Sequence, residues 1–384
     1  MQKIKVLTVF GTRPEAIKMA PLVKELKKHE AIDSRVCVTA QHRQMLDQVL
    51  EIFQIKPDFD LNIMQDRQTL VDITTRAIEG LYAVYTDFKP DMVLVHGDTT
   101  TTFAASLAAF YAKVRVGHVE AGLRTYDKYS PYPEEMNRKL TGAIADLHFA
   151  PTRANKENLI KENVPADTIV VTGNTVIDAL SDTVKKDYCF ADQFLASYSF
   201  DNKRVISVTA HRRENLGEPF ENIFTALRML VEDIPDIEII YPVHLNPVIR
   251  ETAGKILGQH DRIHLIEPLN VQDMHNLMAR SYLVMTDSGG LQEEAPSLGK
   301  PVLVLRNETE RPEAIKAGTV KLAGTQKDTL YREARRLFDH SEEYQKMAKA
   351  VNPYGDGKAS ERIVKALINY FGLSQEKPQE FDAS

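Results

Sequence analysis

Acidic side chains gather in one part of the sequence at positions where their charges would repel one another. The stretch YSPYPEEMNR, residues 129–138, places Glu134 beside a second glutamate behind a proline-pinned loop that opens a helix. Upstream, GHVEAGLRT places Glu120 at the end of a strand. Carboxylates crowded at the end of a sheet need a metal ion, a cluster of cations or proton-transfer chemistry to offset their repulsion. Other parts of the sequence decide between these chemistries.

The residue types argue against a metal site. The HVE of GHVEAGLRT has the H-x-E spacing of zinc deaminases, but their partner motif P-C-x-x-C is missing. The D-x-D of DFDLN, residues 58–62, lies among loop residues with no supporting cluster. Cys37 and Cys189 are isolated from each other, which excludes a cysteine-built site and fits a reducing compartment. We therefore expect no metal and a cytoplasmic protein.

A glycine-rich turn between a strand and a helix predicts a phosphate site. In TDSGGLQEEAPSLGKP, Ser288, Gly289 and Gly290 open a helix, and the backbone amides at such an end attract an anion such as a diphosphate. Glu294, further along the same helix, is placed to accept hydrogen bonds from ribose hydroxyls. The alternative is an Asp/Ser N-cap with glycines for tight packing, although a double glycine is a poor way merely to start a helix.

A second strand-turn-helix segment, FGTRPEAIK, places two cations near a helix start. Arg13 precedes the helix and Lys18 lies further along it, so that both can face a leaving phosphate. The alternative is a helix start with surface cations. The sequence contains no G-x-G-x-x-G fingerprint, so it does not support a tightly held dinucleotide, and we expect no cofactor.

Three further strand ends carry polar side chains that allow two interpretations. HGDTTTTFAA places Asp98 before a hydroxyl-rich helix start, as either a functional acid or an ordinary N-cap. TAHRRENLG offers His211 beside Arg212, and YPVHLNP offers His244. A strand-end histidine followed by arginines suits contact with phosphate, and the alternative is a histidine satisfied by packing.

The elements that must position these residues alternate along the whole chain. Short β-branched runs such as IKVLTVFG precede segments of helical period such as PEAIKMAPLVKELKKH. Strands that read as continuous hydrophobic runs belong to parallel sheets covered by helices on both faces. The alternation restarts after Gly173. We expect an α/β fold of two doubly wound Rossmann-like domains, 1–172 and 173–359, with a C-terminal helix in 360–384 completing the first domain and the tail SQEKPQEFDAS frayed.

The predicted strand ends are also where a ligand is expected. In open parallel sheets, ligands bind beyond the carboxyl ends of the strands, because loops and helix N-termini converge there. The candidate residues lie at or just after such ends. Two sheets of this kind facing each other would form a cleft, and we expect the ligand to bind in it.

The composition excludes other classes of function. With 43% apolar and 27% charged residues over 384 positions, the sequence is ordinary for a globular protein with two cores. The formal net charge of −6 leaves no basic face suited to nucleic acid. No run reaches the roughly 18 apolar residues of a membrane span, and the apolar run at the N-terminus is too short for a signal peptide. We expect neither a nucleic-acid nor a membrane partner.

Long motifs together resemble those of the non-hydrolysing bacterial UDP-N-acetylglucosamine 2-epimerases. They are FGTRPEAIKMAP, HGDTTTTFAASLAAFY, HVEAGLRT with PYPEEMNR, TAHRRENLG and TDSGGLQEEAPSLGKPVLVLRNETERPEA. The resemblance extends from the first strand to NPYGDGKASERI, nearly the whole chain. It implies a fold like that of the GT-B glycosyltransferases, a homodimer, and interconversion of UDP-GlcNAc with UDP-ManNAc, with UDP as the group that leaves and returns.

The resemblance also implies roles for individual residues. The implied catalytic residues are Asp98, Glu120, Glu134 and His211. The implied contacts to the nucleotide sugar are Arg13, Lys18, Arg138, Met274, Ser288, Gly289, Gly290, Glu294 and Arg311, with the uracil near LNVQDM. Activation by a second UDP-GlcNAc is implied at Gln41, Gln44, Arg67, Gln68, Glu134, Arg212 and His244. Where some members have Gln and Phe, this chain has Leu269 and Met274.

The chemistry of this reaction agrees with the residue types. The C2 hydrogen of the sugar is not acidic until the C1–O bond breaks, so UDP must leave as an anion while a carboxylate removes the C2 proton to give 2-acetamidoglucal. Such a route uses cations around the phosphate and acids around the sugar. The alternatives are a GT-B glycosyltransferase, a hydrolysing epimerase, and a catalytically silent nucleotide-sugar sensor.

Overall fold

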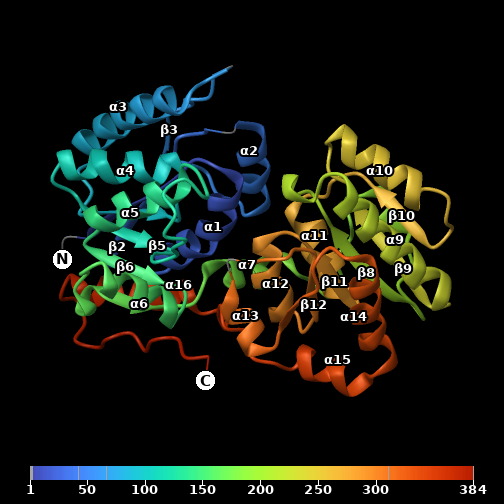
Figure 1. The fold of residues 1–384 in the computed structure, drawn as a ribbon. Coiled ribbons are helices and arrows are strands. Elements are labelled where there is room, and N and C mark those ends of the chain that lie inside the picture. The colour runs from blue at the N-terminus through green and yellow to red at the C-terminus, as the bar shows by residue number, and fades with distance from the viewer. Residues whose placement is uncertain (1–2, 42, 66, 310, 384) are drawn as a thin grey trace. The chain divides into compact units, whose positions relative to one another are not determined.

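The chain folds into two compact units. The computed structural model describes residues 3–41, 43–65, 67–309 and 311–383. Unit 1 extends to Asp182 and takes up the chain again from Tyr354 to Asp382, while unit 2 comprises Thr183–Pro353. Each unit is built around its own parallel sheet (Figure 1). The predicted α/β class with two doubly wound sheets is confirmed.

Unit 1 contains a parallel sheet with strand order β3-β2-β1-β4-β5-β6-β7. Its strands are β1 (Ile4–Phe10), β2 (Ile32–Val38), β3 (Phe59–Asp60), β4 (Met92–His96), β5 (Arg115–Val119), β6 (Leu147–Ala150) and β7 (Ile169–Val171). Its helices are α1 (Arg13–Lys27), α2 (Arg43–Ile52), α3 (Leu70–Phe88), α4 (Thr100–Tyr111), α5 (Glu134–Ile144), α6 (Arg153–Lys161), the 3-10 turn η1 (Ala166–Thr168), α7 (Thr175–Thr183, whose last residue begins unit 2) and α16 (Ala359–Tyr370).

Helices cover both faces of this sheet, which explains its continuous hydrophobic strands. In β1, Val6 and Phe10 pack into a core that includes residues of α1, α2 and α16, while Leu7 and Val9 pack into a second core with α3 and α4. Because successive side chains of a strand point to opposite faces, a strand buried on both sides has no polar alternation. This is why the run IKVLTVF reads as uniformly apolar apart from Lys5 and Thr8.

Unit 2 repeats the arrangement with strand order β10-β9-β8-β11-β12-β13, also parallel. Its strands are β8 (Arg204–Thr209), β9 (Ile237–Pro242), β10 (Ile263–Ile266), β11 (Leu283–Thr286), β12 (Val302–Val304) and β13 (Val320–Leu322). Its helices are α8 (Gln193–Ser197), the 3-10 turn η2 (Arg213–Asn215), α9 (Glu218–Asp233), α10 (Pro247–Leu257), α11 (Val271–Arg280), α12 (Gly289–Ser297), α13 (Pro312–Ala317), α14 (Lys327–Asp339) and α15 (Ser341–Ala348).

The division between the units differs from the predicted boundary at 172/173. The backbone N–H of Asn174 donates to the carbonyl of Tyr354, with the N and O atoms 2.6 Å apart. The carboxylate of Asp178 accepts from the N–H groups of Ala359 at 3.1 Å and Ser360 at 2.8 Å. These bonds tie most of α7 and the segment from Tyr354 onward to unit 1, so residues 173–182 and 354–359 lie in that unit and not in the second.

The C-terminal segment also differs in part from its prediction. The helix α16 ends at Tyr370, and the described residues after it are not helical. The tail is not frayed throughout, because the N–H of Phe381 donates to the carbonyl of Val171 at the edge strand β7, over 2.8 Å. The Phe381 side chain is buried. A single apolar side chain in a polar tail was too weak a pattern to predict this contact.

Both sheets have one point where the chain reverses its direction of winding. In unit 1 this point lies between β1 and β4, and in unit 2 between β8 and β11. Loops that leave the carboxyl ends of these strands diverge to opposite sides, which leaves room for a ligand. No helix in the described part of the chain is long and apolar enough to cross a membrane.

Candidate active site

The loops that follow β1 and β4 in unit 1 are joined by one buried carboxylate. Glu15, in the first turn of α1, accepts hydrogen bonds from the N–H groups of Gly11 at 3.0 Å and Thr12 at 2.8 Å. Its other oxygen accepts from the hydroxyls of Thr99 at 2.7 Å and Thr102 at 3.1 Å. The start of α1, where Arg13 lies, and the start of α4 are therefore fixed relative to each other.

Glu120 lies directly after β5 in an uncommon backbone conformation, with φ of 60°. One of its carboxylate oxygens forms an ion pair with the Lys18 ammonium. The same oxygen accepts a hydrogen bond from the side-chain amide of Asn174 over 2.8 Å. The Nε2 atom of the buried His96 lies 3.6 Å from the same oxygen and has no hydrogen-bond partner among the described residues. A left-handed backbone at a non-glycine residue costs free energy, so the surrounding contacts hold this side chain in place.

The charge of Glu120 is set by these neighbours. Burial alone would raise the pKa of the Glu120 carboxyl, but the Lys18 ammonium and the His96 imidazole hold that pKa well below its ordinary value. Glu120 is therefore an anion at neutral pH.

Asp98, after β4, is paired with Arg138 from α5. The guanidinium donates to one Asp98 oxygen over 2.6 Å and 3.2 Å. Arg138 also donates to Glu135 over 3.0 Å and is buried. The structure thus places Arg138, which the resemblance assigns to the nucleotide sugar, in contact with the acid Asp98.

The adjacent glutamates at the start of α5 have different surroundings. The Glu135 carboxylate is fully buried and accepts from the N–H groups of Thr125 at 3.0 Å and Tyr126 at 3.1 Å, so it fixes the preceding loop. Glu134 is the first residue of α5, and its buried Oε2 has no hydrogen-bond partner within the residues described. An unpaired carboxylate oxygen is an open acceptor for a substrate group.

In unit 2 the carboxyl ends of β8 and β11 are joined by Asp287. Its buried carboxylate accepts from the N–H groups of His211 and Arg212, both at 2.7 Å. The other oxygen lies 3.2 Å from Nδ1 of His211. Burial lowers the pKa of His211, the Asp287 carboxylate opposes this, and Arg212 and His244 lower the pKa further. Asp287 therefore fixes the backbone of His211 and Arg212, and its second oxygen lies close to the His211 ring.

The N-terminus of α12 matches the predicted anion site in part. The Ser288 N–H donates to the Thr286 hydroxyl at 2.9 Å, so this amide is already used within the protein. The Ser288 side chain makes no capping hydrogen bond, which leaves the first amides of α12, from Gly289, directed at the helix end. These amides and the helix dipole favour an anion.

Arg311 adds a positive charge to this helix end. A Cβ atom on Gly289 would lie 2.9 Å from the central guanidinium carbon of Arg311, so only glycine allows the guanidinium to lie there. The Arg311 Nε donates to Glu293 over 2.7 Å, which orients the group. The Arg311 guanidinium lies close to the first turn of α12, so its charge adds to the attraction of an anion there.

Two further predicted substrate residues lie in the same unit. Glu294 of α12 is buried, and its Oε2 is 3.2 Å from Nε2 of His275. Met274 is half-buried in the first turn of α11. Gly290 lies close to Glu294, because a Cβ on Gly290 would be 3.3 Å from Glu294 Oε1.

The residues implied in regulation are divided between the units. In unit 1, Gln41 accepts from the Thr101 hydroxyl at 3.3 Å, and the Gln68 amide donates to the Gln41 carbonyl at 3.4 Å. Gln44 and Arg67 are exposed. In unit 2, Arg212 donates to the Asp287 carbonyl at 3.4 Å, and the His244 ring stacks on His211 with centroids 5.7 Å apart.

Sequence reasoning missed four residues that organise this site: Glu15, His96, Asn174 and Asp287. His96 is the last residue of β4 and Asp287 directly follows β11, and this position at a strand end was the signal that could have found them. Nothing in the local sequence marks Asn174, because its partner Glu120 is 54 residues away. Unit 1 thus offers acids that follow β4 and β5, and unit 2 offers a helix end that favours an anion.

Comparison with known proteins identifies similar chains. The family model for UDP-N-acetylglucosamine 2-epimerase matches residues 24–368. A UDP-N-acetylglucosamine 2-epimerase of Bacillus subtilis (strain 168) is 63% identical over 381 residues, 99% of this chain and 99% of that protein. A solved UDP-GlcNAc 2-epimerase from Neisseria meningitidis bound to UDP-GlcNAc is 54% identical, with TM-score 0.86, over 95% of this chain and 100% of that chain. A crystal structure of UDP-N-acetylglucosamine 2-epimerase is 60% identical, with TM-score 0.92, over 100% of both chains.

Proposed function

The chain belongs to the UDP-N-acetylglucosamine 2-epimerase family, and we propose that it interconverts UDP-GlcNAc and UDP-ManNAc by expelling UDP and adding it back. The enzyme is an isomerase that inverts carbon C2 of the sugar. In this proposal the first amides of α12 hold the UDP, and Asp98, Glu120 and Glu134 act on the sugar.

The order of bond breaking follows from the substrate. C1 is an acetal carbon and no carbonyl adjoins C2, so the C2 proton is not acidic in the intact substrate. When the C1–O bond breaks, its electron pair leaves with the β-phosphate oxygen of UDP. A carboxylate then takes the C2 proton, and the C–H electron pair forms the double bond of 2-acetamidoglucal. In the return step, a proton adds to C2 from the opposite face and UDP bonds again to C1.

Each step has a group suited to it. The first amides of α12, Arg311 and His211 stabilise the departing diphosphate, where negative charge develops. Glu120, held as an anion, stabilises the positive charge at C1. The open oxygen of Glu134 accepts a proton. Asp98, which its ion pair with Arg138 orients, is a further carboxylate for proton transfer.

The observation that carries this proposal is the set of three acids in unit 1. Asp98, Glu120 and Glu134 come from the connections after β4 and β5, and a protein that only binds nucleotide sugars needs no such set. Their contacts support different roles, because two of them are paired with cations and the third has an open oxygen.

Solvent deuterium tests the mechanism. The enzyme is incubated with UDP-GlcNAc in deuterated water, and the product is examined by proton NMR. The expected result is UDP-ManNAc that carries deuterium at C2, because the proton removed exchanges with solvent before the return step. Epimerisation without deuterium would exclude the elimination. Free ManNAc would indicate a hydrolysing epimerase, and UDP release that needs an acceptor would indicate a glycosyltransferase.

Activation by a second UDP-GlcNAc is part of the same proposal. The contacts of Gln41 with Thr101 and Gln68 hold polar side chains of unit 1 together, which supports a binding role for this region. Arg212 and His244 are the members of the implied regulatory set that lie in unit 2. A rate that rises more steeply than hyperbolically with UDP-GlcNAc is the expected sign of this activation.

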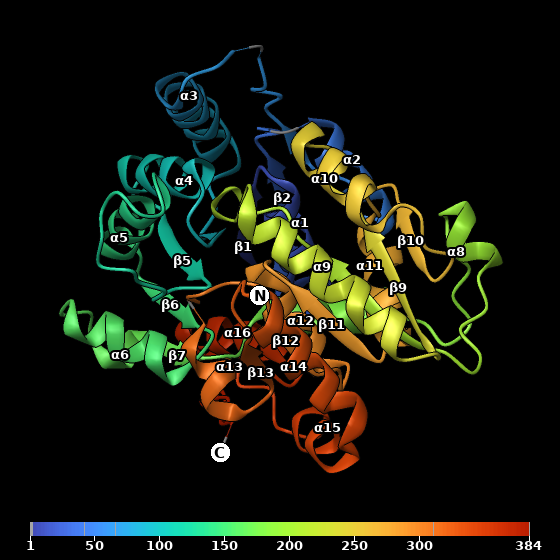
Figure 2. The same ribbon diagram turned by 45° about the vertical axis from the view of Figure 1, so that its right-hand side comes forward.

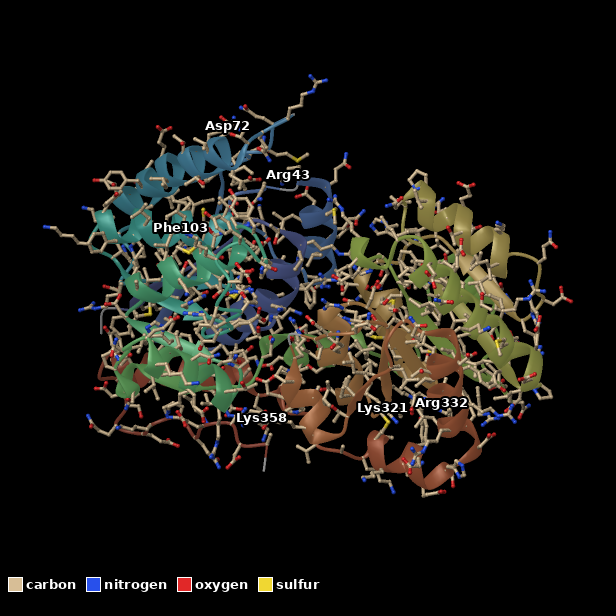
Figure 3. All side chains as sticks on the ribbon, viewed as in Figure 1. Arg43, Asp72, Phe103, Lys321, Arg332 and Lys358 are labelled. Carbon is tan, nitrogen blue, oxygen red and sulfur yellow. The ribbon has the colours of Figure 1, made fainter. Side chains whose placement is uncertain are left out.

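We also propose a homodimer, and the outer side of three helices supports it. In unit 1, α4 packs against both α3 and α5, and the three follow one another in both views (Figures 1 and 2). The helix α4 has no charged residue, and Phe110 and Tyr111 are 64% and 58% exposed. Figure 3 shows Phe103 on the same helix.

The neighbouring helices α3 and α5 also expose apolar side chains. Val71 and Tyr82 on α3, and Met136 and Leu140 on α5, are exposed at helical spacing. Large exposed apolar side chains on adjacent helices are typical of an interaction surface, and an uncharged helix such as α4 suits contact with a second copy of itself. A second copy of the chain is therefore the proposed occupant of this surface.

A cytoplasmic location completes the proposal. Cys37 and Cys189 are both free thiols, as expected for a reducing compartment.

A further inference from the structure

We propose that Thr183 and His275 position Glu294 for the ribose of UDP, and that this chain of hydrogen bonds sets the preference of the enzyme for a ribonucleotide. The inference rests on the proposed function, because it takes UDP as the ligand of unit 2. It goes further by assigning a specificity role to two residues that would not touch the substrate.

The His275 ring lies between two hydrogen-bond partners. His275 is on α11 and is 2% exposed. Its Nε2 lies 3.2 Å from Oε2 of Glu294, and its Nδ1 lies 2.7 Å from the Thr183 hydroxyl oxygen. A carboxylate only accepts hydrogen bonds, so the proton of the first bond is on Nε2. The Thr183 hydroxyl holds the ring in the orientation that points this proton at Glu294.

The position of Thr183 is itself fixed. Thr183 is 1% exposed, and the side-chain amide of Asn276 donates to its carbonyl over 2.8 Å. The oxygen of the same amide accepts from the N–H of Lys185 over 3.1 Å. Because His275 and Asn276 are neighbours on α11, both ends of the Thr183–His275 contact are held by one helix.

This arrangement leaves one oxygen of Glu294 for a ligand. Oε2 is bonded to His275, whereas Oε1 lies beside Gly290 in the first turn of α12, next to the proposed diphosphate site. A ribose hydroxyl can donate to a carboxylate oxygen in that place, and a deoxyribose lacks that donor. A buried acceptor that loses its donor costs binding free energy, so the ribonucleotide is preferred.

The experiment compares binding of UDP and 2′-deoxy-UDP by calorimetry. Wild type is expected to bind UDP roughly tenfold more tightly, as one unmade buried hydrogen bond would give. Thr183→Val, which removes only the hydroxyl, and His275→Phe should bring the ratio of the two dissociation constants close to one. Thr183→Ser keeps the hydroxyl and should restore the ratio.

A matched control tests whether Thr183 acts by positioning Glu294 or only by packing. Thr319 is a buried threonine of the same unit whose hydroxyl donates to the Ala314 carbonyl at 3.2 Å, and Thr319→Val should leave the ratio as in wild type. If Thr183→Val and His275→Phe weaken both nucleotides equally, the two residues act in packing only and the proposal is overturned.

Other outcomes distinguish this proposal from the proposed function. A wild type that epimerises UDP-GlcNAc but binds both nucleotides equally overturns the positioning role alone. A wild type that binds neither nucleotide overturns both. If Thr183→Val does not fold, nitrogen NMR of His275 in wild type replaces it: UDP should shift the Nε2 resonance more than 2′-deoxy-UDP does, and equal shifts contradict the proposal.

Discussion

At the scale of single residues, Glu134 and Glu135 show how neighbours in the sequence take different roles. Glu135 points into the protein, where two backbone N–H groups and Arg138 satisfy its carboxylate. Glu134 has an open oxygen. A carboxylate whose oxygens are already bonded within the protein is a poor acceptor for a substrate proton, so of these two glutamates we propose a catalytic role only for Glu134.

Glu120 provides the prediction at this scale. We expect Glu120→Gln to lower kcat on the order of 10²- to 10⁴-fold, because the amide carries no charge to stabilise C1 and cannot take part in proton transfer. UDP affinity should be unchanged, since the diphosphate contacts are proposed in unit 2. Steady-state kinetics and calorimetry with UDP measure the two quantities.

A matched control for this variant is Glu157→Gln on the surface of α6, where the side chain is exposed. It should behave as wild type in both assays. Turnover of Glu120→Gln at the wild-type rate would remove Glu120 from the catalytic set.

At the scale of elements, β5 and β6 bury a pair of histidines. His118 and His148 are opposite each other in the register of these strands, and both are buried. Burial lowers the pKa of His118 to about 3 and that of His148 to about 4. His118 also bonds through Nε2 to the Gly97 carbonyl at 2.7 Å, which supports the loop that carries Asp98.

This pair predicts how stability depends on pH. In the unfolded chain, each histidine takes up a proton once the pH falls below its ordinary pKa of about 6.5. In the folded chain, His148 takes up its proton only near pH 4 and His118 only near pH 3. The free energy of unfolding should therefore fall as the pH is lowered from 7 to 5, by about 2 kcal/mol for each histidine.

The variant His148→Gln tests this sign and size. Its free energy of unfolding, measured in urea at pH 7 and pH 5, should fall by about 2 kcal/mol less than that of wild type over the same interval. Whatever the substitution costs in packing is present at both pH values and cancels. An equal fall in both proteins would show that His148 does not remain neutral in the folded chain.

At the scale of the whole molecule, unit 1 is built from two separate parts of the chain. The chain leaves unit 1 after Asp182 and returns at Tyr354. The returning helix α16 buries Ile363, Val364 and Leu367 in the core that also contains residues of α1 and α2. Unit 1 thus depends on residues from both ends of the sequence.

The proposed dimer gives the prediction at this scale. Phe110→Glu should convert the dimer into a monomer of 43.4 kDa, because a carboxylate cannot be buried in an apolar interface without a partner. The fold should survive, since Phe110 is 64% exposed within the chain. Size-exclusion chromatography with light scattering measures the mass.

The control for the dimer is Val351→Glu, at a position in unit 2 that is 61% exposed and lies outside the three helices. It should keep the mass of wild type. The surface is not the interface if Phe110→Glu keeps that mass too.

The sequence by itself determined the features that depend on short stretches. Continuous apolar runs and helical periods predicted the parallel sheets, and the double glycine after a strand predicted the start of α12. These succeed because backbone conformation and burial of a strand or helix follow the pattern of neighbouring residues. The two-residue strand β3 was too short for such a pattern, and DFDLN, which contains it, was predicted to be a loop.

Only the tertiary structure decided which side chains meet. Lys18 and Glu120 are 102 residues apart, and His211 and Asp287 are 76 apart, so their contacts depend on how whole strands and helices pack. The charge and orientation of a catalytic group depend on the few atoms around it, and those atoms come from parts of the chain that only the folded core brings together.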